Sequence, residues 1–116
     1  MTRLKTSMNK ALIACVAMIA VLVLDAAEAA NPDAAKKIVT EVCQACHGAD
    51  GNSATADYPK LGGQHPDYLA KALRDYKSGL RKNPIMAGFA GSLSKQDIEN
   101  LAAYFAAQPA VLVVKH

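Results

Sequence analysis

The chain has 116 residues, of which 52% are hydrophobic, and this length suits one small domain with a modest core. Thirteen Lys and Arg residues against ten Asp and Glu residues give a formal net charge of +3. A nucleic-acid-binding face is usually much more basic. Length and charge therefore exclude a second sizeable domain and argue against nucleic-acid binding.

The N-terminal segment is typical of a secretory signal peptide. Its first ten residues carry three basic side chains and no acid, residues 11–24 are wholly apolar, and small residues follow. We expect cleavage after Ala29, because alanines then occupy both small-residue positions. The apolar run has 14 residues, whereas a membrane-spanning helix needs about 20, so we expect no stable membrane insertion.

Cleavage would leave residues 30–116 as a single domain. This domain has two cysteines, Cys43 and Cys46, and one methionine, Met86. Two cysteines cannot form the disulfide framework that stabilises many small exported domains. We therefore expect a bound group to complete the core.

The pattern of apolar residues predicts an all-α domain. A first helix is expected to begin at Asn31, with Pro32 as its first residue, and to run through the pentapeptide CQACH at 43–47 to Gly48. Residues 48–65 are rich in glycine and small polar side chains, so they predict a long loop.

The second half of the domain adds two more predicted helices. One spans 66–79 and ends at a glycine. Residues 80–91 lack helical periodicity, and Pro84 disfavours helical geometry at the residue before it, so we expect a loop that carries Met86. The last helix is expected to begin at Ser94 and to end at Pro109.

Three kinds of site compete for Cys43, Cys46 and His47. A dithiol exchange motif usually follows a strand at the start of a helix, whereas this one ends a helix. A zinc site needs four ligands, and the remaining histidines, His65 and His116, lack the usual tight spacing. The pattern C-x-x-C-H is that of covalent haem attachment, in which both thiols bind the porphyrin and the histidine binds the iron. We favour haem c, whose ring system would also fill the core.

A haem iron bound by His47 needs a second axial ligand, or it stays open to small ligands. Met86 is 39 residues downstream and is the one methionine left after cleavage, so we expect its sulfur to bind the iron. The alternative role of Met86 is that of an ordinary core residue. His65, in a turn, and His116, at the C-terminus, are weaker candidates.

Four stretches, CQACHGADGNS, YPKLGGQHPDYLAKALRDYKSG, NPIMAGFAG and LSKQDIENLAAYFAAQ, resemble class I c-type cytochromes. The similarity extends over about residues 34–108 and is to the small bacterial cytochrome c553 group and to single domains of periplasmic dihaem cytochromes. It implies three to four helices wrapped around one covalently attached haem, with the first and last helices crossing near Tyr104 and Phe105. The resemblance further implies thioethers at Cys43 and Cys46. It implies that His47 and Met86 are the axial iron ligands, one on either face. It also implies a hydrogen bond from His47 to the carbonyl of Pro59.

An iron with both axial positions occupied leaves no place for a substrate, so we expect a periplasmic electron carrier of a respiratory chain rather than an enzyme. Two alternatives remain: a haem subunit of a larger oxidoreductase, docked through the apolar tail 109–116, and an open-site haem protein with ligand-binding or peroxidase activity. The protein would be a monomer or a subunit of a complex. Expected partners are redox proteins with acidic surfaces, facing a rim of basic side chains: Lys60, Lys71, Lys77, Arg81 and Lys82.

Overall fold

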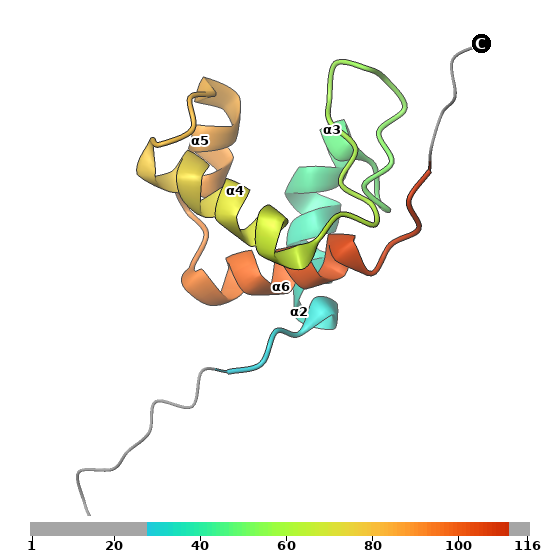
Figure 1. The fold of residues 1–116 in the computed structure, drawn as a ribbon, viewed down its shortest axis with the longest axis horizontal. Coiled ribbons are helices and arrows are strands. Elements are labelled where there is room, and N and C mark those ends of the chain that lie inside the picture. Colours follow the sequence, from blue (N-terminus) through green and yellow to red (C-terminus); the bar gives the residue numbers. More distant parts are fainter. Residues whose placement is uncertain (1–27, 112–116) are drawn as a thin grey trace, which may run out of the picture.

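A computed structural model describes residues 28–111 (Figure 1), and within this range the chain forms helices and no strand. No helix in the described range has the length and apolar content needed to cross a membrane. The predicted signal peptide falls almost wholly outside these residues, and so does the end of the tail. The elements in chain order are α2 (Pro32–Ile38), the π-helical turn η1 (Val39–Cys43), α3 (Gln44–His47), α4 (Pro66–Ser78), α5 (Pro84–Ala90) and α6 (Lys95–Ala106).

The first helical segment begins where the sequence predicted. The Asn31 side chain accepts a hydrogen bond from the Asp33 N–H at 3.0 Å, and Pro32 takes the first helical position. The expectation of one regular helix is corrected, because the segment widens into η1 before α3 continues to Gly48. Apolar residues at i, i+3 and i+4 are compatible with both forms, so the pattern could not reveal a π-helical turn, a feature that is frequent at functional sites.

The predicted loop over 80–91 is wrong in its central part, where α5 forms. Asn83 has an extended backbone, as the following proline requires, but its side chain accepts hydrogen bonds from the N–H groups of Ile85 and Met86 at 3.0 Å. Pro84 then occupies the first helical position, where its missing N–H leaves no bond unmade. Met86 therefore lies in the first turn of a helix.

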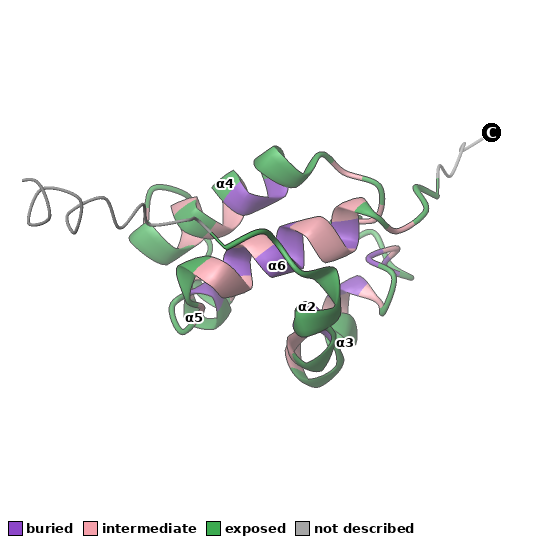
Figure 2. Cartoon of the chain, turned by 90° about the horizontal axis from the view of Figure 1, so that it is seen from below, coloured by how far each residue is buried: buried purple, intermediate pink, exposed green. Residues whose placement is uncertain are grey.

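Helix α6 is central to the packing of the domain. It packs against both α2 and α4, and α4 also packs against α5. Figure 2 shows buried residues along α6, and these are Ile98, Asn100, Leu101, Ala102 and Phe105. The buried core consists of residues from three helical segments: Ala35, Val39, Leu69, Ala70, Ile98, Leu101, Ala102 and Phe105.

Two polar contacts fix the ends of the first helical segment against α6. The buried Asn100 accepts hydrogen bonds from the Asn31 N–H at 2.7 Å and from Gln96 Nε2 at 3.0 Å. The Tyr104 hydroxyl donates to the carbonyl of Ala49 at 2.8 Å. The first and last helices thus pack together as the resemblance implied, with α6 joined to both ends of the segment.

The capping box of α6 provides a test of local stability. Ser94 Oγ accepts the Asp97 N–H at 3.0 Å and donates to Asp97 Oδ2 at 2.7 Å. We expect Ser94→Ala to lower the free energy of unfolding by about 1 kcal/mol.

The loss of unfolding free energy in Ser94→Ala is expected to depend on pH. The hydrogen bonds from Ser94 hold the pKa of Asp97 below its ordinary value. The contribution of the ionised carboxylate is therefore complete above the pKa in the unfolded chain, and it is lost as the pH falls through the lower pKa of the folded state. Denaturant titrations at neutral and strongly acidic pH should show a smaller difference between wild type and variant in acid; an equal difference at both would contradict the assignment.

Candidate functional site

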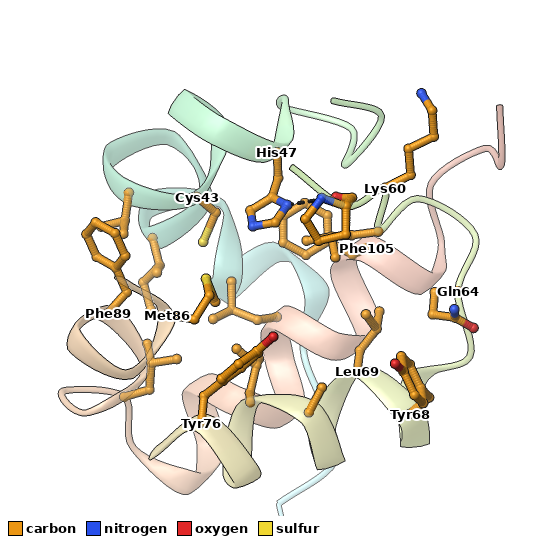
Figure 3. A pocket seen from close by; sticks show the side chains of 18 of the residues that line it. Cys43, His47, Lys60, Gln64, Tyr68, Leu69, Tyr76, Met86, Phe89 and Phe105 are labelled. Atoms are coloured by element: carbon orange, nitrogen blue, oxygen red, sulfur yellow. Dashed lines mark hydrogen bonds between the residues drawn. The ribbon is translucent and has the colours of Figure 1, made fainter. Parts of the chain in front are cut away.

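A cavity of about 260 Å³ lies between the first helical segment, the loop that precedes α4, and helices α4 to α6 (Figure 3). Its wall is mainly apolar and includes the rings of Tyr76, Phe89 and Phe105. A second hollow of about 140 Å³ is lined by Cys43, His47 and Met86, which also line the first, and extends to the surface near Tyr58. Because the two hollows share these lining residues, we treat them together as the candidate site.

His47 is buried, with 7% of its surface exposed, and its ring has a fixed orientation. Its Nδ1 lies 2.9 Å from the carbonyl oxygen of Pro59. Because a carbonyl can only accept a hydrogen bond, Nδ1 carries the proton, and Nε2 is left with a lone pair. In Figure 3 this second nitrogen points into the cavity, on the side where Cys43 and Met86 lie.

The two cysteines lie on the same helical segment as this histidine. Cys43 ends η1 and lines the main cavity, while Cys46 lies in α3 and lines the second hollow. They are not joined in a disulfide. Burial raises the pKa of the Cys43 thiol, and the charge and hydrogen bond of Cys46 raise the pKa of the neighbouring Tyr58 hydroxyl. The segment thus directs two thiols and one imidazole to a single site.

Met86 enters the cavity from a different element, α5. It is half-buried and lies close to Cys43 and Phe89 in Figure 3. Its N–H is bound by the Asn83 side chain, so the cap of α5 fixes the backbone from which the sulfur projects. The fold therefore brings Met86 and His47 to the same cavity although the two are far apart in the sequence.

The loop that carries Pro59 is held by bonds that the sequence analysis did not identify. The buried Ser53 hydroxyl lies 2.6 Å from the carbonyl of Tyr58 and 3.1 Å from that of Thr55. The carbonyl of Gly51 accepts from the N–H of Leu61 at 2.7 Å. A serine among small polar loop residues gives little signal in a sequence, because the same composition is also typical of exposed loops.

The structure describes one of the two weaker candidates for an iron ligand. His65 is exposed at the residue before α4, and among the described residues it does not line the cavity. His116 lies outside the described residues. Within residues 28–111 no group of three or more His, Cys, Asp or Glu side chains is gathered around a possible metal position.

Most of the predicted basic rim makes contacts within the domain. Lys71 forms an ion pair with Asp75, and Lys77 donates to the carbonyl of Leu93. Arg81 donates to the Tyr68 hydroxyl at 3.3 Å, and its guanidinium stacks on the Tyr76 ring at 4.9 Å. Lys60 points away from the cavity in Figure 3 and donates to the carbonyl of Ser53 at 3.3 Å.

The donor set fits a covalently bound haem. Two thiols at C-x-x-C spacing suit attachment to a porphyrin, and an imidazole with a free Nε2 suits the iron. The thioether sulfur of Met86, which lines the same cavity, is suited to be a soft second ligand, and the apolar wall suits a large flat ring system.

Comparisons with known proteins agree with this fit. A cytochrome c family model matches residues 32–108. Cytochrome c4 of Pseudomonas aeruginosa is 45% identical over 101 residues, which are 87% of this chain and 49% of that protein. The thiosulfate dehydrogenase electron acceptor of Stutzerimonas stutzeri is 44% identical over 69 residues, which are 59% of this chain and 32% of that protein.

A solved structure shows the same arrangement of helices. The chain superposes on cytochrome c4 of Acidithiobacillus ferrooxidans with a TM-score of 0.64 and 26% sequence identity, covering 69% of this chain and 51% of that one. The chain thus spans about half the length of the cytochrome c4 proteins that it matches.

Gly51 offers a test of how the loop supports the site. Its φ is +75°, and a Cβ there would lie 2.7 Å from the Gly62 nitrogen and 2.8 Å from Phe105 Cδ1. We expect Gly51→Ala to lower the free energy of unfolding by about 2–4 kcal/mol, through backbone strain and overpacking. Denaturant titration measures the loss.

Gly88→Ala is the matched control. Gly88 lies in α5, and a Cβ there would meet no atom within 4 Å. Because alanine favours a helix, this variant should be neutral or more stable by up to about 1 kcal/mol. Equal losses for the two variants would show that the loop has no special constraint at Gly51.

Proposed function

Because the chain belongs to the cytochrome c family and has the class I cytochrome c fold, we propose that it carries single electrons between redox proteins by means of one haem c. The observation that carries the proposal is the meeting of His47 and Met86 at the wall of one cavity, together with the free Nε2 of the histidine. The name of one relative, a thiosulfate dehydrogenase electron acceptor, describes this role for that protein.

The first helical segment would hold the cofactor. The sulfur atoms of Cys43 and Cys46 would each form a thioether to the porphyrin, and His47 would offer Nε2 to the iron. Its Nδ1–H donates to Pro59, which keeps the ring in one orientation and makes Nε2 a stronger donor. The haem, once bound, supplies an iron that alternates between the ferrous and ferric states.

Met86 would complete the coordination from α5. A thioether is a soft ligand that favours the reduced state, and so does a mainly apolar cavity that excludes water. With both axial positions taken by side chains, the chain leaves no position for a substrate. The protein therefore acts as an electron-transfer protein and not as an enzyme, whether free or as a subunit of an oxidoreductase.

The partner would make contact where the second hollow opens at the surface. Three side chains there, Tyr58, Ile85 and Phe89, are 40%, 63% and 49% exposed. A redox partner that covers these side chains would bring its own redox centre close to the haem. An electron could then pass without any bond being made or broken. Two basic residues, Lys60 and Arg81, line the main cavity, and they would favour a partner with an acidic rim.

Replacing Met86 by Leu tests the axial sulfur while it preserves side-chain volume. We expect the oxidised wild-type protein to show the weak long-wavelength band of sulfur bound to iron, and the variant to lack it. We also expect the reduced variant to bind carbon monoxide readily. Absorption spectra of the haem-loaded proteins measure both effects.

Leu80→Ala is the control for this experiment, because Leu80 is 81% exposed and does not line the cavity. It should leave the band unchanged. A wild-type protein that lacks the band and binds carbon monoxide as the variant does would instead support an open-site haem protein, with Met86 as a core residue.

The extent and location of the mature protein form part of the proposal. The signal-like N-terminus supports export to the periplasm, cleavage after Ala29 and a mature domain of residues 30–116. The single C-x-x-C-H motif supports one haem. Intact mass of the protein purified from a host with haem-attachment machinery tests both, and we expect residues 30–116 plus one haem; a retained N-terminus or a second haem would contradict this proposal.

A further inference from the structure

Asn52 joins the C-terminal tail to the loop that bears Pro59. Its Nδ2 donates to the Pro109 carbonyl at 2.8 Å, and its Oδ1 accepts from the Val111 N–H at 3.1 Å. The two bonds bracket Ala110 much as a neighbouring strand would. The side chain thus makes a two-point connection between segments that are 57 and 59 residues apart in the sequence.

A short segment of the loop, residues 61–63, packs against both Asn52 and the tail with no room to spare. A Cβ on Gly62 would lie 2.7 Å from Asn52 Nδ2, and a Cβ on Gly63 would lie 2.6 Å from the Cβ of Ala110. Side chains are excluded at both positions because three backbones approach one another closely. Asn52 and the tail therefore act together as a clamp on residues 61–63.

The clamped segment follows Pro59 in the chain after only one further residue. The N–H groups of Leu61 and Gly62 donate to the Gly51 carbonyl at 2.7 and 3.2 Å, and Gly63 N–H donates to the Phe105 carbonyl at 3.0 Å. Residues 61–63 are thus bound on one side by the residues before Asn52 and on the other by the end of α6. The position of the Pro59 carbonyl depends on this anchored segment.

We propose that Asn52 is a positioning residue for the axial histidine. Asn52 clamps the tail against the loop and so holds the Pro59 carbonyl in place. This inference rests on the proposed function, in which His47 binds the haem iron. A firmly held acceptor makes the imidazole a stronger donor, and a stronger donor favours ferric iron. Loss of the clamp is therefore expected to weaken the bond from His47 Nδ1 and to raise the reduction potential.

Asn52→Ala removes both bonds to the tail. In the reduced, haem-loaded protein, we expect the His47 Nδ1 proton and the Val111 amide proton to exchange with solvent about tenfold faster than in wild type. We expect the midpoint potential to shift upward. Nuclear magnetic resonance measures the exchange rates, and a redox titration measures the potential.

Two further variants separate the clamp from general destabilisation. Val111→Pro removes one N–H donor and leaves Asn52 intact, so it should reproduce part of the effect on the His47 proton and on the potential. Ser94→Ala weakens the cap of α6, away from the loop, and should change neither. The same changes in Ser94→Ala as in Asn52→Ala would overturn the proposal.

A second result would also overturn it. If Asn52→Ala frees the Val111 amide but leaves the His47 proton and the potential unchanged, the clamp is merely structural. That result, in a protein that shows the sulfur-to-iron band, would overturn the role of Asn52 alone. A wild-type protein without a bond between His47 and iron would instead overturn the proposed function and the axial role of His47. The exchange rate of the Val111 amide proton would then still report whether Asn52 clamps the tail.

Discussion

The hydrogen bond from His47 Nδ1 to the Pro59 carbonyl is the contact on which the geometry of the site depends. The two partners lie on elements of different kinds, since the histidine ends a helical segment whereas the proline lies in a loop without regular backbone pairing. The helix fixes the backbone position of His47, and the hydrogen bond to the loop fixes the orientation of its imidazole ring. A loop can do this only where its own backbone is held. Here the Ser53 hydroxyl donates to the Tyr58 carbonyl, and the Gly51 carbonyl accepts from the Leu61 N–H.

The core of the domain is small and lies to one side of the cavity. Leu101 and Val39 are its largest fully buried side chains, and α6 contributes more buried residues than any other helix in the described range. The cavity wall beyond this core is mainly apolar. A ring system bound there would complete the core, so that stability and function would have one physical source. This explains how a short chain without a disulfide among its described residues builds a defined site.

The places where sequence and structure differ have separate physical causes. Pro84 was correctly read as incompatible with helical geometry at Asn83, but the same proline begins α5, because the Asn83 side chain accepts the free N–H groups of that helix. The π-helical turn could not be seen, since its apolar pattern is that of an α-helix. Ser53, Asn52 and Asn100 were missed because small polar residues in a sequence carry no sign of a partner that is distant along the chain.

The sequence by itself determined the chemistry and the class of fold. The spacing of Cys43, Cys46 and His47 indicates haem attachment because two thiols and an imidazole on one helical segment have few other uses in a chain with a predicted signal peptide. Capping and periodicity predicted three of the helices, since those signals lie within a few residues of one another. The family resemblance implied the contact between Pro59 and His47, which the structure shows. Only the tertiary structure decided that Met86 enters the same cavity from a helix and that the tail binds Asn52. Those contacts join distant segments, and their positions follow from the packing of α2, α4 and α6 rather than from any local pattern.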